Sequence, residues 1–415
     1  MIGDLVTIDE HITTLKGFAF KSAWYTEKGV PIVKVSDFTQ DSVSPEKVAF
    51  IPIESSSDFE KYKLEKGDVL IQTVGSWEHN PNSVVGKVVR IPEVLNDSLL
   101  NQNIVKIIPK ETLDKSFLFY LLKSDAFKGY IIKTAQGAAN QASITLESIK
   151  AFKFTYKDKT TQRKIASILS AYDDLIENNL KRIKLLEEKA QLHYKELMQE
   201  VIYSKIKREE CIKDCLAFYI GGGWGEEDYK EGFTEAAFVI RGTDIPDAKK
   251  GEVKGIPFRY HKESNLASRN MQTGDIVFEV SGGSKGQPVG RSILITEKML
   301  QQFGKPVMCA SFCKMLRPNE NITPEFFYLY LLASHENGVI AQYEKHSASN
   351  IVNYGFEEFI GEQKITIPKE SELKAFTEKV KHIFTLISTL GEQNTKLREA
   401  RDILLPKLMN GQIEV

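Results

Sequence analysis

Apolar residues recur at alternating spacings of three and four from about Lys159 to Tyr203, and no proline or glycine interrupts this stretch. Such spacing is typical of a helix that packs lengthwise against another helix. A helix of this length would extend roughly 60 Å, which is longer than a small domain is wide. We therefore predict one long helix that needs a partner of similar length. Its expected seam positions are Ile165, Leu169, Tyr172, Ile176, Asn179, Ile183, Leu186, Ala190, His193 and Leu197.

The C-terminal stretch carries the same pattern. Shifting the first helix by 211 residues places Leu169 on Val380 and Leu197 on Leu408, so the apolar rows coincide. We predict that the two helices pack side by side, whereas the alternative is two unrelated surface helices on separate domains. The second set of seam positions is Phe376, Val380, Ile383, Ile387, Leu390, Asn394, Leu397, Arg401, Leu404 and Leu408.

The direction of packing follows from the connection. The segment between Ile202 and Ile212 is too short to return along a long helix at about 3.5 Å per residue, which favours an antiparallel pair. Asn179 and Asn394 are polar seam residues near the middle of each helix. They either approach each other and fix the register, as single polar residues do in coiled coils, or face solvent at a loosened turn.

The regions before the two helices also repeat. Gly67-Asp68 and Gly274-Asp275 each precede a β-branched apolar run, which indicates a turn that leads into a strand. Further segments match in the same order at offsets of 207 to 212 residues. The sequence thus predicts an α+β fold with a pseudo-two-fold internal repeat, in which two tandem globular domains are separated by two long antiparallel coiled-coil helices. The expected parts are a first domain at 1–157, a helix at 158–203, a second domain at 204–369, and a second helix with a tail at 370–415.

Composition narrows the function only slightly. The chain has 415 residues and a formal net charge of −1, so no overall positive field indicates binding to nucleic acid or membrane. Local patches and partner subunits remain compatible with DNA binding. The N-terminus lacks the pattern of a signal peptide, and no apolar run approaches the length of a membrane span. We expect a cytoplasmic protein.

The four cysteines form two pairs of equal spacing, Cys211 with Cys215 and Cys309 with Cys313. A four-thiolate zinc site is conceivable, but zinc knuckles usually have two residues between thiols rather than three. In the repeat, Cys309 and Cys313 occupy the positions of Leu100 and Ile104. We therefore expect buried apolar side chains and no metal site.

Sequence motifs indicate no active site. The chain contains no phosphate-binding loop and no Pro-Pro pair of the kind that DNA methyltransferases use. Pro246-Asp247 followed by Glu252-Val253-Lys254 resembles the metal site of some nucleases, whose carboxylates must converge on one Mg²⁺. Only four residues separate Asp247 from Glu252, which favours a solvated turn. We predict no catalytic residue and no cofactor.

Polar loops in both repeats carry the side-chain types that read base edges in a major groove. In the first repeat they lie between Thr73 and Lys87 and between Thr134 and Thr145, and in the second repeat at the matching positions. The candidate DNA-binding residues are Ser76, Trp77, Glu78, His79, Asn80, Asn82, Lys87, Gln136, Asn140, Gln141 and Ser143, then Ser281, Ser284, Lys285, Gln287, Arg291, His346, Ser347, Ser349 and Asn350.

Taken in order, the repeated segments resemble a known family. Those that carry the resemblance are Lys16-Gly17-Phe18-Ala19-Phe20-Lys21-Ser22 with Gly29-Val30-Pro31-Ile32, Lys66-Gly67-Asp68-Val69-Leu70-Ile71, Arg241-Gly242-Thr243-Asp244-Ile245 and the C-terminal run from Leu397 to Gly411. The whole chain is similar to the specificity subunit of a type I restriction–modification system. Family members often have a Pro-Pro…Glu-Gln motif before each helix. In this chain the matching segments, residues 159–162 and 369–373, keep only part of that motif.

The resemblance implies two target recognition domains, each of which reads one half of a split, asymmetric site in double-stranded DNA. The helices would then set the length of the unread spacer. It also implies two methyltransferase subunits and two motor-nuclease subunits as partners, which would carry S-adenosylmethionine, ATP and Mg²⁺. Two alternatives stay open, a metal-dependent nuclease with fused recognition domains and a coiled-coil scaffold that does not bind DNA.

Overall fold

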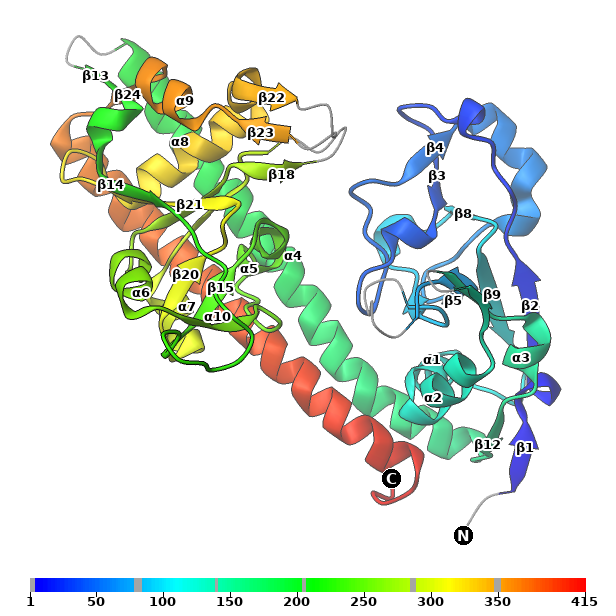
Figure 1. The fold of residues 1–415 in the computed structure, drawn as a ribbon. Coiled ribbons are helices and arrows are strands. Elements are labelled where there is room, and N and C mark those ends of the chain that lie inside the picture. The colour runs from blue at the N-terminus through cyan, green and yellow to red at the C-terminus, as the bar shows by residue number, and fades with distance from the viewer. Residues whose placement is uncertain (1–3, 78–83, 139–140, 204–206, 284–288, 347–351) are drawn as a thin grey trace. The chain divides into compact units, whose positions relative to one another are not determined.

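The structure is a computed structural model that describes residues 4–77, 84–138, 141–203, 207–283, 289–346 and 352–415. The chain divides into two compact units (Figure 1). Unit 1 comprises residues 1–174 and 399–415, and unit 2 comprises residues 175–398. Each long helix therefore contributes residues to both units.

The described residues of unit 1 form four small sheets and three short α-helices, in addition to its parts of the two long helices. The largest sheet is antiparallel, with the order β2 (Ile12–Lys16), β9 (Ile104–Pro109), β5 (Val69–Gln72) and β7 (Val88–Arg90). In the next sheet, β3 (Val30–Val33) lies antiparallel to β4 (Ala49–Ile51) and parallel to β8 (Leu99–Leu100). The other two sheets are β10 (Gln136–Ala138) with β11 (Gln141–Ser143) and β6 (Val74–Gly75), and β1 (Leu5–Thr7) with β12 (Lys153–Thr155). The helices are α1 (Lys115–Lys123), α2 (Asp125–Lys133) and α3 (Leu146–Lys150).

Unit 2 repeats every one of these sheets with the same strand order. Its four-stranded sheet is β14 (Leu216–Gly221), β21 (Cys313–Pro318), β17 (Ile276–Glu279) and β19 (Ser292–Leu294). Next come β16 (Phe258–His261), β15 (Glu235–Ile240) and β20 (Val307–Cys309), then β18 (Ser281–Gly283), β23 (Val352–Tyr354) and β22 (Glu344–His346), then β13 (Arg208–Cys211) with β24 (Lys364–Ile367). The helices are α5 (Ile245–Ala248), α6 (Glu263–Arg269), α7 (Glu297–Phe303), α8 (Pro324–Glu336) and α9 (Phe356–Glu362). The predicted duplication is confirmed by this shared topology.

The Gly-Asp turns show how the sequence repeat produces the structural repeat. Gly67 has φ of +78° and Gly274 has φ of +93°, a conformation that strongly favours glycine. The carboxylate of the following residue, Asp68 or Asp275, accepts a hydrogen bond of 2.8 Å from the backbone N–H three positions earlier. Both turns lead directly into an inner strand, β5 or β17, of the four-stranded sheet of their unit.

The two long helices are α4 (Lys159–Tyr203) and α10 (Glu370–Met409), as predicted. Every predicted seam position on them is buried or half-buried. The buried row shifts by one residue at two places: Tyr194 is buried whereas the predicted His193 is only half-buried, and Leu405 is buried whereas the predicted Leu404 is only half-buried. Among the described residues, no helix is long and apolar enough to cross a membrane.

Within each unit, α4 and α10 run antiparallel. In unit 1, Ile165 and Leu169 of α4 share an apolar cluster with Leu408 of α10. In unit 2, the Nδ2 of Asn179 donates a 3.0 Å hydrogen bond to the Oδ1 of Asn394, and both side chains are buried. The antiparallel prediction is confirmed, and the alternative of solvent-facing asparagines is wrong.

Candidate nucleic-acid interface

The two candidate loop regions of unit 1 come together in one small antiparallel sheet. Strand β11 pairs with β6 on one side and with β10 on the other. Ser143 of β11 therefore lies opposite Val74 of the first region and opposite Gln136 of the second. Polar segments that are far apart in the sequence thus form one continuous surface.

The exposed side of this sheet is polar. Gln136, Gln141 and Ser143 are exposed, while Ala142 between them is fully buried, which is the alternation of a strand with one face on the core. The hydroxyl of Ser143 donates to the backbone carbonyl of Gln136 at 3.3 Å. Amide and hydroxyl groups offer both donors and acceptors, and a two-stranded ribbon fits a B-DNA major groove.

The other described candidates of unit 1 are less exposed. Ser76, Trp77 and Lys87 are half-buried, and Trp77 packs against the main apolar core of the unit. Burial lowers the pKa of Lys87, because desolvation disfavours its charged form. The candidates that lie outside the described residues are Glu78, His79, Asn80, Asn82 and Asn140.

Unit 2 assembles its candidate regions in the same way. Strand β23 lies between β18 and β22, so Ser281 stands opposite Asn353, and His346 stands opposite Val352. The carboxylate of Glu344 in β22 accepts a 2.9 Å hydrogen bond from the backbone N–H of residue 289. The candidates that lie outside the described residues are Ser284, Lys285, Gln287, Ser347, Ser349 and Asn350.

The candidate Arg291 forms an ion pair with Glu279 within unit 2. Its guanidinium makes a two-pronged contact with the carboxylate of Glu279, at 2.8 and 2.5 Å, and Glu279 is only 2% exposed. These hydrogen bonds raise the pKa of Arg291. Sequence reasoning overlooked Glu279 because it ends an apolar strand. Its counterpart in unit 1 is the amide Gln72, and this acid–amide difference was the available signal.

Each unit also carries an exposed tryptophan beside a cation, which the sequence analysis did not identify. In unit 2, the guanidinium of Arg259 lies 4.4 Å from the ring centre of Trp224, which is 38% exposed. In unit 1, the ammonium of Lys21 lies 5.6 Å from the ring centre of Trp24, which is 39% exposed. Such pairs are common in binding surfaces.

The carboxylates of Asp247 and Glu252, on which the nuclease alternative depends, do not converge on one point. The side chain of Asp247 is 73% exposed and points near Lys250, 4.0 Å away. Glu252 instead forms an ion pair of 2.9 Å with Arg398 of α10, although the pair lacks hydrogen-bond geometry. Among the described residues, no group of three His, Cys, Asp or Glu side chains could hold a metal ion. The motif therefore gives no support to a nuclease site.

The cysteines of unit 2 lie where the repeat places them. Cys309 and Cys313 are buried in one apolar cluster, and Leu100 and Ile104 occupy a corresponding cluster of unit 1. Burial raises the pKa of Cys309 to about 12, which keeps this side chain a neutral thiol. Both cysteines therefore serve the core as small apolar side chains.

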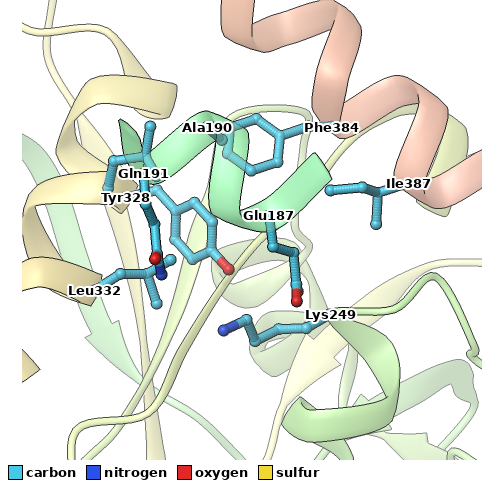
Figure 2. Close-up of a pocket in the computed structure, with 9 residues that line it drawn as sticks. Glu187, Ala190, Gln191, Lys249, Tyr328, Leu332, Phe384 and Ile387 are labelled. Carbon is cyan, nitrogen blue, oxygen red and sulfur yellow. The ribbon is translucent and has the colours of Figure 1, made fainter. Parts of the chain in front are cut away.

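A small pocket lies in unit 2 between α4, α8 and α10 (Figure 2). Its volume is about 50 Å³, which can hold water but not a nucleotide or a cofactor. Figure 2 shows the polar ends of Glu187, Lys249 and Tyr328 along one side of it. Burial raises the pKa of Tyr328 well above its ordinary value, and the nearby Glu187 adds to this effect.

Comparisons with known proteins agree with this architecture. Residues 1–188 match the family model of the type I restriction modification DNA specificity domain. A putative type I restriction enzyme MjaX specificity subunit from Methanocaldococcus jannaschii is 24% identical, over 93% of this chain and 88% of the relative. The MjaIX specificity subunit from the same organism is 27% identical, over 77% of this chain and 74% of the relative. The HindI specificity subunit from Haemophilus influenzae is 24% identical over 85% of this chain and 88% of the relative.

A solved structure shares the fold. The crystal structure of the S subunit of a type I restriction–modification system from M. genitalium superposes with a TM-score of 0.52 at 17% identity, and the match covers 98% of this chain and 96% of that one. The duplicated α+β units with two long helices are thus a fold that this chain shares with that subunit. The first repeat thus matches the type I restriction modification DNA specificity domain, and the chain as a whole is similar to type I specificity subunits.

Proposed function

We propose that this specificity subunit reads a bipartite, asymmetric site in double-stranded DNA, with one half-site for each repeat. Residues 1–157 and 204–369 are the two target recognition domains, and residues 158–203 and 370–415 are the helical segments between and after them. The small sheets β6–β11–β10 and β18–β23–β22 carry the reading surfaces. Because their residues differ, the two half-sites have different sequences.

The single observation that supports this proposal is the gathering of both polar regions of each repeat into one sheet. In unit 1 that sheet exposes Gln136, Gln141 and Ser143. A glutamine amide pairs in bidentate fashion with adenine, and each good pair contributes about 1–3 kcal/mol of discrimination. Base reading by these side chains requires no catalytic group on this chain.

The chemistry then belongs to partner subunits. Two methyltransferase subunits would bind S-adenosylmethionine and modify adenine, and two motor-nuclease subunits would use ATP and Mg²⁺. The near-zero net charge of the specificity subunit suits an assembly in which partners neutralise much of the DNA backbone. The helices would act as a ruler, so that half-sites are centred roughly one helical turn, about 34 Å, apart. The assembly would work in the cytoplasm.

Methylation mapping tests the proposal. The chain is expressed with its methyltransferase partner in a host that lacks DNA methylation, and modified adenines are located by sequencing. We expect a single split motif with an unread spacer. If the complex forms with cofactor present and no adenine is modified, the non-DNA scaffold is the better account.

Point substitutions then assign the reading face. Gln136→Ala and Gln141→Ala in unit 1 should each slow methylation by about 10- to 100-fold and relax one half-site only. Gln393→Ala, at a glutamine of α10 that is also exposed, is the matched control and should leave the motif unchanged. Relaxation of both half-sites by one substitution would contradict the assignment of one reader to each repeat.

The ruler is tested separately. Insertion of one heptad into both α4 and α10 preserves the phase of their seam and should lengthen the unread spacer. An unchanged spacer in the mapped motif would show that the helices do not set it.

A further inference from the structure

Because the two long helices have similar apolar patterns, a helix of one copy of this chain could pair with the same helix of another copy. Because α4 and α10 carry the same apolar rows at an offset of 211 residues, α10 of one copy has the pattern needed to pair with α10 of another. The same holds for α4 with α4. A duplicated helix pair needs features that favour the mixed pair over these alternatives.

The buried asparagine contact is one such feature. Asn179 binds Asn394, yet the two residues are not equivalent in the repeat, since Asn179 corresponds to Leu390 and Asn394 to Ile183. In an α10–α10 pair of the same register, each Asn394 would face Leu390 of the other copy. In an α4–α4 pair, Asn179 would face Ile183. The native pair leaves only the Nδ2 of Asn394 without a partner, whereas both alternatives also remove the one hydrogen bond between the two amides, which is costly.

A buried ion cluster in unit 1 is the second feature. Arg401 of α10 is 3% exposed, and its guanidinium lies 2.6 Å from Asp173 of α4 and 2.9 Å from Asp41. Asp173 also accepts a 2.6 Å hydrogen bond from the hydroxyl of Tyr120 and lies 2.8 Å from the guanidinium of Arg90. Unit 1 therefore provides a buried acidic site that binds the arginine side chain of α10.

The positions in unit 2 that correspond to Arg401 and Asp173 carry no ion pair of this kind, because both residues are apolar. Ala190 stands at the position of Arg401, and Phe384 stands at the position of Asp173. Both line the 50 Å³ pocket of Figure 2, whose wall includes the cation Lys249. This site accepts a small apolar side chain and has too little space for a guanidinium.

The difference decides what α10 can pair with. If a second α10 replaced α4 in unit 2, Arg401 would enter the pocket beside Lys249. At the same time, Arg398 would replace Glu187, the carboxylate that lines the pocket. Two arginines would then lie beside the half-buried Lys249 without an anion from the incoming helix, which is unfavourable.

We propose that the Asn179–Asn394 contact and the Arg401 cluster select the pairing of α4 with α10 and prevent two copies of this chain from assembling through α10–α10 contacts. The two features lie in different units and act independently. Neither depends on the proposed reading of DNA.

The test gives α10 the residues that α4 carries at the equivalent places. The triple variant Asn394→Ile, Arg398→Glu, Arg401→Ala is made in the full chain, with Lys407→Ala on the exposed side of α10 as the control. Native mass spectrometry measures the mass, and cross-linking of a mixture of ¹⁴N- and ¹⁵N-labelled chains identifies contacts between copies. We expect the dimer-to-monomer ratio to rise at least about tenfold, the equivalent of 1.4 kcal/mol, with new α10–α10 cross-links.

A milder variant guards against misfolding of the triple variant. Asn179→Leu with Asn394→Ile removes one feature and leaves no unpaired amide, so the helices should fold, as circular dichroism will check. It should give the same cross-links at a smaller dimer-to-monomer ratio. Absence of α10–α10 cross-links in the folded variants, or their presence in the unmodified chain, would overturn the proposal.

Discussion

The two units share one topology but satisfy their buried charges with different partners. Asp68 in unit 1 lies 2.5 Å from Lys106 and 2.7 Å from Lys115, whereas its counterpart Asp275 in unit 2 is held by both prongs of Arg317, at 2.7 and 2.8 Å. The turn that positions the carboxylate is the same in both. The backbone geometry of the repeat is therefore the fixed part, and the cation that completes it is free to vary.

The largest effect is expected at Asp275, which is fully buried. Asp275→Ala leaves Arg317 without its carboxylate and removes the hydrogen bond that closes the turn. The free energy of unfolding of unit 2 should therefore fall by about 3 kcal/mol. This value is near the low end for a broken buried ion pair, because Arg317 is partly exposed. Urea unfolding with hydrogen exchange in β17 measures the loss. Asp247→Ala, at an exposed aspartate of the same unit, should change stability by less than about 0.5 kcal/mol. Equal losses would contradict the assigned role of the pair.

A second effect concerns Gly391 on α10. A Cβ at this position would lie 2.2 Å from the backbone oxygen of Lys250, so Gly391→Ala should destabilise unit 2 by about 1–3 kcal/mol. At Gly129 on α2 of unit 1, a Cβ would have no neighbouring atom within 4 Å, so Gly129→Ala should stabilise by about 0.5–1 kcal/mol. Thermal unfolding of both variants checks the opposite signs, and a stabilising Gly391→Ala would refute the close approach.

A smaller effect concerns the pH dependence of the stability of unit 1. Burial acts to raise the pKa of Asp68, but the hydrogen bond from Glu65 and the contacts with Lys106 and Lys115 outweigh it, so the pKa is lowered. A lowered folded-state pKa adds stability above the unfolded-state pKa, and this stability is lost as the pH falls through the folded value. Acid unfolding of unit 1 should therefore depend less on pH in Asp68→Asn. An unchanged pH dependence would show that Asp68 does not contribute.

The smallest effect is expected in the core of unit 2. Replacing either Cys309 or Cys313 by Val, the apolar residue nearest to Cys in shape, should change stability by less than about 1.5 kcal/mol, since the buried side chain stays small and apolar. Because burial raises the pKa of both thiols, a thiol reagent at pH 8 should modify the half-buried Cys211 before them. Mass spectrometry after limited labelling checks the order. Fast modification of Cys309 would contradict its burial.

Local periodicity was enough to predict the helices and the repeat. The spacing of Leu169, Ile176 and Ile183 follows directly from helix geometry, and the Gly-Asp turns follow from backbone preferences. The shift from His193 to Tyr194 was not predictable, because packing against Phe326 of α8, with ring centres 5.4 Å apart, selects the residue that turns inward.

The candidate interface was predicted only in part. Polarity located the loop regions, but nothing local shows that β6 pairs with β11, because strand pairing depends on the whole fold. Nor does polarity show that Arg291 binds Glu279. Sequence placed Arg401 in the seam, yet its partners Asp41 and Asp173 are separated from it by 360 and 228 residues.

The composition of unit 1 has a consequence for the order in which the chain folds on the ribosome. Unit 2 has all of its residues once position 398 has been made, whereas unit 1 still lacks residues 399–415. Until Leu405 and Leu408 arrive, the apolar side chains of Ile165 and Leu169 lack part of their cover. Unit 1 is thus the first unit to be synthesised and the last to complete its core. Until residues 399–415 are made, it exposes apolar surface of the kind that chaperones bind.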